Sequence, residues 1–200
     1  YSNGKKIGTW TSWYENGKMK AQGEWKNGRR NGKWIRYDKN GKVATEGFHK
    51  ENKEVGQWTH FYPNGAKKEV GTYDKNKKKT GKWQLWYENG KLRSKVTYKG
   101  GKKNGLSVNM YNGGKKKSEG SWVSDKQQGQ WTYWYENGQL KSEGSFNKGK
   151  RDGLWTYQYE NGQKKSEENL SNDKRNGQAT YWYENGQTAS AGNFKNGTRI

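Results

Sequence analysis

The sequence predicts an all-β protein: an elongated, single-layer antiparallel meander of tandem β-hairpins with about sixteen strands. Three observations predict this fold. A 24-residue repeat runs through the chain, an Asn-Gly pair stands at the centre of nearly every repeat, and aromatic residues alternate with polar ones on both sides of that pair. Asn-Gly between two such runs is the strongest short-range signal for a β-hairpin.

The repeat is marked by a leading glycine, which recurs every 24 residues from Gly8 to Gly177 except for one interval of 25. Residues 1–7 match the tail of a preceding repeat, and residues 8–200 form one array. The eight repeats span 8–31, 32–55, 56–80, 81–104, 105–128, 129–152, 153–176 and 177–200. Since neither end resembles a capping repeat, we expect the sequence to be an excerpt of a longer array or to have adjoining segments.

Composition excludes a conventional globular core. Only 26% of the residues are hydrophobic, and 12 Trp and 14 Tyr stand against 4 Phe and 2 Met. Aromatic rings must therefore supply most of the burial. The net charge of +21 makes this a basic protein that favours anionic partners. Without cysteine, neither disulfides nor thiolate zinc sites can form.

Each hairpin is expected to have one packed and one open face. A two-residue type I′ turn at Asn16-Gly17 would pair Trp13 with Lys20 and Trp10 with Gly23. The face of Trp10, Ser12, Tyr14, Met19, Ala21 and Gly23 is interpreted as packed, with the Trp10 indole lying across Gly23. Thr11, Trp13, Glu15, Lys18, Lys20 and Gln22 then share the opposite face.

The opposite face carries the candidate binding residues. Its aromatic ladder consists of Trp13, Tyr37, Phe61, Trp86, Trp134 and Trp182, with Met110 and Gln158 at the remaining positions. Directly across from the ladder we expect Lys20, Lys68, Arg93, Lys117, Lys141 and Lys165. Cation–π contacts there would contribute about 0.5–1 kcal/mol each. The plainer interpretation is that the ladder only holds a thin sheet together.

A second candidate surface is a basic edge formed by the loops between repeats. It consists of Arg29, Arg30, Lys77, Lys78, Lys79, Lys102, Lys103, Lys150, Arg151, Lys174 and Arg175. The Asn-Gly turns lie along the other edge, where glutamates dilute the positive charge.

Catalytic chemistry is not indicated. The two histidines, His49 and His60, fall in different repeats without metal-ligand spacing and are interpreted as incidental. The glutamates recur at equivalent positions, and we expect no repeat to gain a cluster of unusual polar residues. The glycines follow the repeat, so they do not indicate a phosphate-binding loop. We therefore predict no enzyme, no cofactor and no metal.

Nothing in the sequence indicates a membrane segment. No apolar run approaches the roughly 20 residues that a membrane helix needs, and no stretch resembles a signal peptide. We expect a soluble chain and leave its compartment open.

The segments YENGKLRSK, YENGQLKSEG and FNKGKRDGLWTYQYENGQ resemble MORN-repeat variants, in the bacterial subset represented by YwqK-type antitoxins. The resemblance covers nearly the whole chain. It implies tandem β-hairpins in an elongated sheet, with members that bind proteins or, among eukaryotic relatives, acidic phospholipids. Some bacterial members are regarded as immunity partners of toxins.

The first functional hypothesis is a non-enzymatic protein-binding array, antitoxin- or immunity-like, that uses the aromatic ladder and its lysines against an acidic protein surface. The alternative is a binder of an anionic polymer, such as nucleic acid, or of an acidic phospholipid surface through the basic edge. A structural scaffold or spacer is the third possibility. Partner identity and oligomeric state stay open.

Overall fold

The computed structural model describes all 200 residues and contains strands and turns but no helix. The chain forms two compact halves, residues 1–102 and 103–200. The N-terminal half holds β1 (Gly8–Trp13), β2 (Met19–Lys26), β3 (Arg29–Tyr37), β4 (Val43–Lys50), β5 (Lys53–Phe61), β6 (Lys67–Tyr73), β7 (Lys79–Trp86) and β8 (Leu92–Lys99). The C-terminal half holds β9 (Lys102–Met110), β10 (Lys116–Val123), β11 (Lys126–Trp134), β12 (Leu140–Asn147), β13 (Lys150–Gln158), β14 (Lys164–Ser171), β15 (Lys174–Trp182), β16 (Thr188–Lys195) and β17 (Thr198–Arg199).

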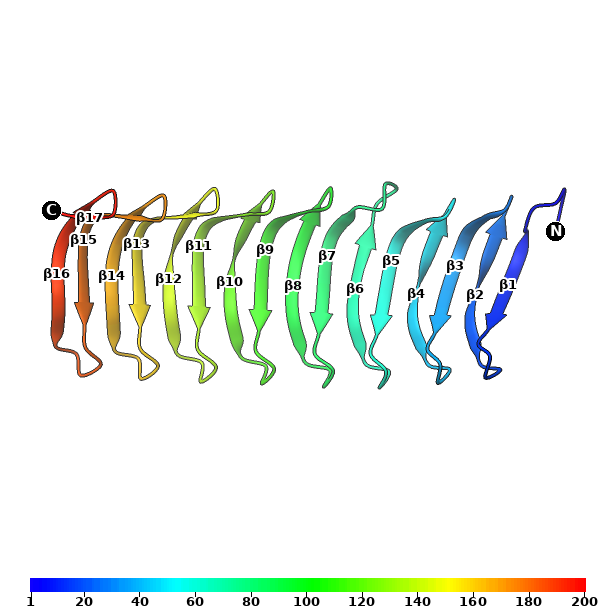
Figure 1. The fold of residues 1–200 in the computed structure, drawn as a ribbon, viewed down its shortest axis with the longest axis horizontal. Helices are drawn as coiled ribbons and strands as arrows, with labels where there is room; N and C mark the ends of the chain where they lie inside the picture. Colours follow the sequence, from blue (N-terminus) through cyan, green and yellow to red (C-terminus); the bar gives the residue numbers. More distant parts are fainter. The chain divides into compact units, whose positions relative to one another are not determined.

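Within each half, every strand pairs antiparallel with the strand that follows it in the chain (Figure 1). The predicted all-β meander of tandem hairpins is confirmed. The predicted register is also confirmed along most of the first hairpin, where Trp10 faces Gly23 and Ser12 faces Ala21.

The central turn of each hairpin differs from the prediction. The amide of Gly17 donates to the carbonyl of Tyr14, and the amide of Tyr14 donates to the carbonyl of Lys18. Gly17 has a positive φ of 78°, whereas Asn16 does not. The loop therefore has three residues and ends in a glycine bulge, and the predicted two-residue type I′ turn is wrong here. Asn16 instead uses its side-chain Oδ1 to accept the amide of Lys18.

Type I′ geometry occurs at the other end of the strands, in the turns that link successive repeats. Asn27 and Gly28 have φ values of 51° and 75°, and they join the directly paired residues Lys26 and Arg29. The linking turn of the 25-residue repeat is the exception. There the amide of Lys77 donates to the carbonyl of Asp74, so the extra residue is absorbed by a three-residue loop.

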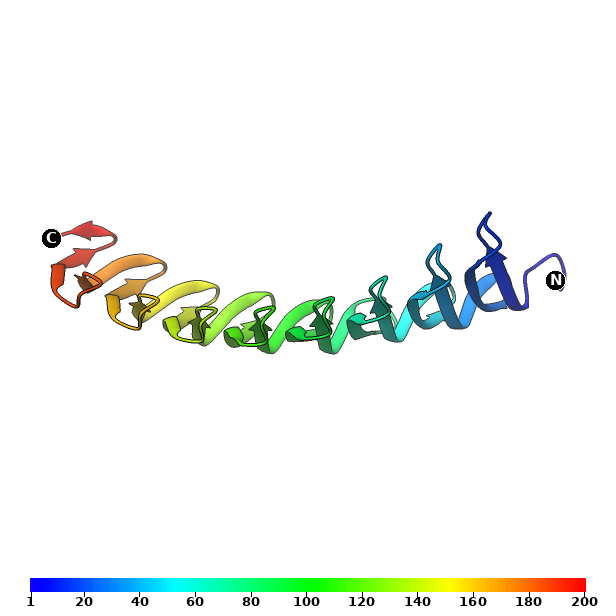
Figure 2. The same cartoon turned by 90° about the horizontal axis from the view of Figure 1, so that it is seen from below.

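The leading glycines form bulges that bend the strands. Gly23 pairs with Trp34 but Trp25 pairs with Arg30, so Glu24 faces three residues, 31–33, of β3. Gly32 lies in this bulge with a φ of 79°, a conformation that other L-residues rarely adopt. Figures 1 and 2 show the strands of each hairpin curving over near the linking turns, where these glycines lie.

The core is a row of tryptophans packed against glycine. Trp34, Trp58, Trp83, Trp131 and Trp155 are buried, which confirms the predicted packed face, here called the indole face. A Cβ atom on Gly23 would collide with the ring of Trp34. Each indole thus covers the glycine of the preceding repeat, and the expectation that Trp10 covers Gly23 is wrong. The indole N–H of Trp34 donates to the carbonyl of Glu24 (3.1 Å), opposite the bulge.

Tyrosine hydroxyls tie each hairpin to the next one. Tyr14 donates from its hydroxyl to the carbonyl of Tyr37 (2.8 Å), and Tyr135 donates to that of Gln158 (2.8 Å). Equivalent bonds are made by Tyr62, Tyr111 and Tyr159. These bonds satisfy strand carbonyls and fix the rings in a row along the indole face.

Candidate binding surface on the indole face

A first row of cations covers the tyrosines of the indole face. The Nζ atom of Lys20 lies 5.6 Å from the centre of the Tyr14 ring, and that of Lys141 lies 5.2 Å from the Tyr135 ring. The other pairs are Lys68 on Tyr62, Arg93 on Tyr87, Lys117 on Tyr111 and Lys165 on Tyr159. We call Lys20, Lys68, Arg93, Lys117, Lys141 and Lys165 the tyrosine-row cations.

The prediction placed these cations beside the aromatic ladder on the opposite face, and that placement is wrong. Trp13 pairs with Met19 while Ser12 pairs with Ala21, so Lys20 is an extra residue in a bulge. A bulge reverses the alternation of side chains beyond it. Met19 therefore lies across from Trp13, and Lys20 lies on the indole face.

A second row of cations lies over the core rings, near the bend. The Nζ atom of Lys79 is 3.7 Å from the centre of the Trp83 ring, and Cζ of Arg30 is 4.8 Å from that of Trp34. Lys6 lies over Trp10 and Arg151 over Trp155. Lys103 and Arg175 hold the same position in the repeat but lie over the neighbouring rings of Trp122 and Tyr181. We call Lys6, Arg30, Lys79, Lys103, Arg151 and Arg175 the indole-row cations.

The residues of the predicted basic edge thus fall into two groups. Arg30, Lys79, Lys103, Arg151 and Arg175 are half-buried over the rings. Arg29, Lys77, Lys78, Lys102, Lys150 and Lys174 are exposed at the linking turns. Several of these cations are partly neutralised, because Lys79 pairs with Glu69 (2.8 Å) and Lys77 pairs with Glu54 (3.1 Å).

The aromatic ladder on the opposite face is only partly covered. Trp13 is 61% exposed, whereas Tyr37, Phe61, Trp86, Trp134 and Trp182 are half-buried. Two of these rings do have a cation, but it comes from the preceding hairpin, on the strand next to the one that carries the ring. Lys116 lies 5.5 Å from the Trp134 ring and Lys164 lies 5.7 Å from the Trp182 ring. Both lysines are paired with glutamates, Glu119 and Glu167.

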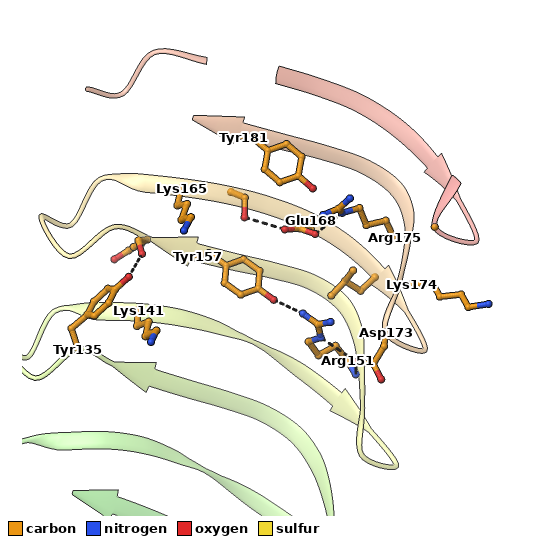
Figure 3. A pocket seen from close by; sticks show the side chains of 14 residues that line it. Tyr135, Lys141, Arg151, Tyr157, Lys165, Glu168, Asp173, Lys174, Arg175 and Tyr181 are labelled. Atoms are coloured by element: carbon orange, nitrogen blue, oxygen red, sulfur yellow. Dashed lines mark hydrogen bonds and ion pairs between the residues drawn. The ribbon is translucent and has the colours of Figure 1, made fainter. Parts of the chain in front are cut away.

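The indole face is hollowed between its two cation rows. In the N-terminal half, a groove of about 540 Å³ lies between Lys20 and Tyr14 on one side and Arg30 and Trp34 on the other. In the C-terminal half, a groove of about 620 Å³ crosses β12 to β15 (Figure 3). It is lined by Tyr135, Lys141, Arg151, Tyr157, Lys165, Ser166, Glu168, Arg175 and Tyr181, among others.

The C-terminal groove lies where the repeat is broken. Glu168 occupies the glycine position of the core, and Ala179 occupies the tryptophan position directly across from it. The Glu168 carboxylate accepts hydrogen bonds from Nε of Arg175 (2.8 Å) and from the Ser166 hydroxyl (3.1 Å). The expectation that no repeat gains an unusual polar cluster is therefore wrong. Both departures are visible in the sequence as breaks in the glycine and tryptophan series.

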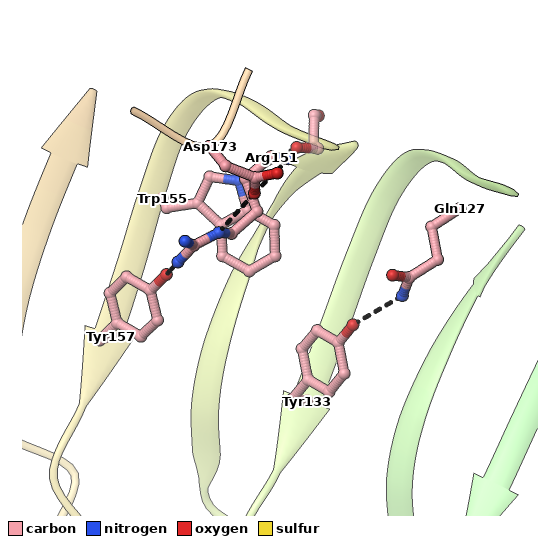
Figure 4. A network of polar contacts seen from close by, with 7 residues as sticks. Gln127, Tyr133, Arg151, Trp155, Tyr157 and Asp173 are labelled. Atoms are coloured by element: carbon pink, nitrogen blue, oxygen red, sulfur yellow. Dashed lines mark hydrogen bonds and ion pairs between the residues drawn. The ribbon is translucent and has the colours of Figure 1, made fainter. Parts of the chain in front are cut away.

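A polar network borders the same groove (Figure 4). Arg151 donates from Nε to Asp173 (3.1 Å) and from Nη1 to the Tyr157 hydroxyl (2.8 Å), above the Trp155 ring. The Arg151 amide donates to Asp173 (3.0 Å) and holds the pKa of that carboxyl below its usual value. Burial raises the pKa of the Tyr157 hydroxyl. At the equivalent position one repeat earlier, Gln127 donates to Tyr133 (2.9 Å).

His49 belongs to the core of the N-terminal half. Its ring packs edge-on against Trp34 and Trp58, at centroid distances of 5.6 and 5.1 Å. Burial, reinforced by the positive charge of Arg30, lowers the pKa of His49 to about 4. The ring is therefore neutral at pH 7 and takes the position that Tyr73 and Phe146 occupy in other repeats.

The hairpins of this chain match the family model of the MORN repeat variant in seven segments. These are residues 6–27, 30–51, 54–75, 79–99, 127–148, 151–172 and 175–196. Residues 22–33 also match the MORN repeat. Because the matches cover most of the sequence, the chain belongs to the MORN repeat variant family. Comparison with curated proteins gives no match.

MORN repeats are generally modules that bind proteins or membranes, and their arrays are binding scaffolds. The structure contains no helix that is both long and apolar enough to cross a membrane.

Proposed function

We propose that this chain is a non-enzymatic protein-binding array whose indole face binds an acidic surface of a protein partner, in an antitoxin- or immunity-like role. The observation that supports the proposal is the double row of cations over aromatic rings, repeated from hairpin to hairpin. The proposal moves the binding surface from the aromatic ladder to the face that holds the cations.

The chemistry of this face is typical of protein interfaces. Tyr, Trp and Arg are the residues that most often dominate binding energy. The cations are already ordered over rings, so they lose less side-chain entropy on binding than free lysines would. Hydrogen bonds from the tyrosine hydroxyls to strand carbonyls hold the rings in place. A partner therefore meets a preorganised surface.

A second candidate function is the binding of nucleic acid or acidic phospholipid through the exposed edge. Arg29, Lys77, Lys78, Lys102, Lys150 and Lys174 project there, and the net charge of +21 favours any polyanion. Such binding should weaken steeply with salt, because it depends on the release of counterions.

Charge-matched variants distinguish the two surfaces. One variant carries Lys20→Gln, Lys68→Gln and Lys141→Gln in the tyrosine row, and its control carries Lys78→Gln, Lys102→Gln and Lys150→Gln at the edge. Binding of a fluorescent Glu-rich peptide, measured by anisotropy at physiological salt, should weaken about tenfold or more in the first variant only. Equal weakening in both, or binding only to acidic liposomes or oligonucleotides at low salt, would reject the proposal.

Two further measurements complete the test. Replacing Trp86, Trp134 and Trp182 with Ser examines the opposite face, and we expect peptide binding to persist in that variant. The antitoxin-like role is tested by co-expressing the array with toxins encoded beside its gene. Failure to bind or neutralise any of them would reject that role.

A further inference from the structure

The pairing of β14 with β15 places a charged pair where the pairing of β12 with β13 has an indole. Ala179 is fully buried, although it is much smaller than tryptophan. Across from it, Glu168 binds Arg175, whose guanidinium lies 5.4 Å from the Tyr181 ring and 5.3 Å from the Phe194 ring. The carboxylate and guanidinium therefore lie at the level of the core and open onto the groove.

This arrangement leaves donors available in the groove. The bond from Arg175 to Glu168 uses one of the five N–H donors of the guanidinium. Lys165 and Lys141 stand on the far side of the groove, each over a tyrosine ring and without a carboxylate partner. The Tyr181 hydroxyl is buried beside the charged pair.

The two carboxylates in the groove limit what can bind. Glu168 opposes a multiply charged phosphate group, because like charges in a partly buried site repel strongly, and Asp173 adds a weaker repulsion at the exposed rim. A single carboxylate on a polypeptide is better matched. It would accept hydrogen bonds from Arg175 and Lys165, and neighbouring positive groups of the same partner would face Glu168 or Asp173.

We infer that the groove over β13 to β15 is a specificity subsite that takes one Asp or Glu side chain of the acidic protein partner. This inference rests on the proposed function and refines it. It assigns one place in the array where a particular acidic side chain of the partner is recognised. The remaining hairpins supply a repeated cationic surface. The lining of the subsite combines two guanidinium groups, three lysines and two carboxylates.

The most direct test is a double variant that restores the glycine and tryptophan of the regular repeat. Glu168→Gly together with Ala179→Trp recreates the pair seen at Gly144 and Trp155, and the new indole fills the space now held by the charged pair. The double variant should unfold at the same temperature as the wild type or higher. Its affinity for the Glu-rich peptide should fall at least about tenfold.

A milder variant keeps the test valid if the double variant does not fold. Arg175→Gln should weaken peptide binding more than Arg30→Gln, its equivalent in the N-terminal half. Equal losses in these two variants, or unchanged affinity in the folded double variant, would overturn the subsite. The proposed function would still stand if the tyrosine-row variant loses binding. Absence of peptide binding to the wild type would overturn both.

Competition identifies the source of the anion. Inorganic phosphate and phosphatidylserine vesicles are added to the wild-type complex with the Glu-rich peptide and to the Arg175→Gln complex. We expect no selective displacement from the wild type at physiological salt. Selective displacement would overturn the inference, because the groove would then be a phosphate site.

Discussion

The pairing of β12 with β13 and that of β14 with β15 solve the same packing problem in two ways. In the first, Gly144 lies beneath the buried indole of Trp155, whose N–H donates to the carbonyl of Ser145 (3.0 Å). In the second, Glu168 pairs with Ala179 across the strands and its carboxylate accepts a hydrogen bond from Arg175. One pairing is apolar and closed, and the other is polar and opens onto a groove.

The difference shows that the glycine and tryptophan positions form one unit of packing. A Cβ on Gly144 would collide with the Trp155 ring, so a side chain can appear at the glycine position only where the indole is absent. Glu168 can therefore occupy the glycine position only because Ala179 replaces the indole. At β14 and β15, a groove accompanies the change of both residues.

The largest effect is expected from breaking the regular pairing. Trp155→Ala should lower the free energy of unfolding by about 3–5 kcal/mol, because it removes a buried ring and leaves a cavity over Gly144. Adding Gly144→Glu to this variant imitates the pairing of β14 with β15, with Arg151 available as the partner. Urea unfolding should show partial recovery. A double variant less stable than Trp155→Ala would contradict the coupling.

A smaller effect concerns His49, another polar residue within the ring packing. Burial lowers its pKa to about 4, so the folded state binds the proton more weakly than the unfolded state. The stability due to the neutral ring is complete above pH 6.5 and is lost as the pH falls towards 4, by roughly 3 kcal/mol. His49→Phe, which imitates Phe146, should reduce this pH dependence in thermal unfolding. An unchanged pH dependence would contradict the assignment.

The smallest effect is expected at the rim of the groove. Asp173→Asn keeps an acceptor for the Arg151 amide, as Asn52 does for the Arg30 amide (2.8 Å), and loses only an exposed ion pair. The loss should be below about 1 kcal/mol. Because the pKa of Asp173 is lowered, this contribution is present above pH 3.8 and disappears as the pH falls below it. A constant difference down to low pH would show that the charge is not involved.

The sequence predicted the strands and the packed face because both depend on short-range patterns. The register from Trp10 and Gly23 to Ser12 and Ala21 follows from hairpin symmetry and was correct. The predicted face of Lys20 was wrong, because a bulge opposite Ser12 and Trp13 reverses the alternation of side chains between the two faces. Asn-Gly was also ambiguous. It forms a type I′ turn at Asn27-Gly28 and a three-residue loop at Asn16-Gly17.

The groove was harder to predict because it depends on contacts between repeats. Ala179 is visible as a break in the tryptophan series, and Glu168 is visible as a break in the glycine series. Their relation requires the register across the linking turn, including the bulge at the leading glycine. Reasoning within one hairpin expects each indole to cover the glycine of its own repeat, whereas it covers the glycine of the preceding repeat.

The linking turn between β6 and β7 shows how such an array can be extended. Its extra residue changes a two-residue turn into a three-residue turn, yet Trp83 still covers Gly71 and donates to the carbonyl of Thr72 (3.3 Å). The length of a linking turn can thus change without altering the packing of the indole on its glycine. A reporter peptide or epitope grafted between Asp74 and Lys78 would be displayed without disturbing the neighbouring hairpins.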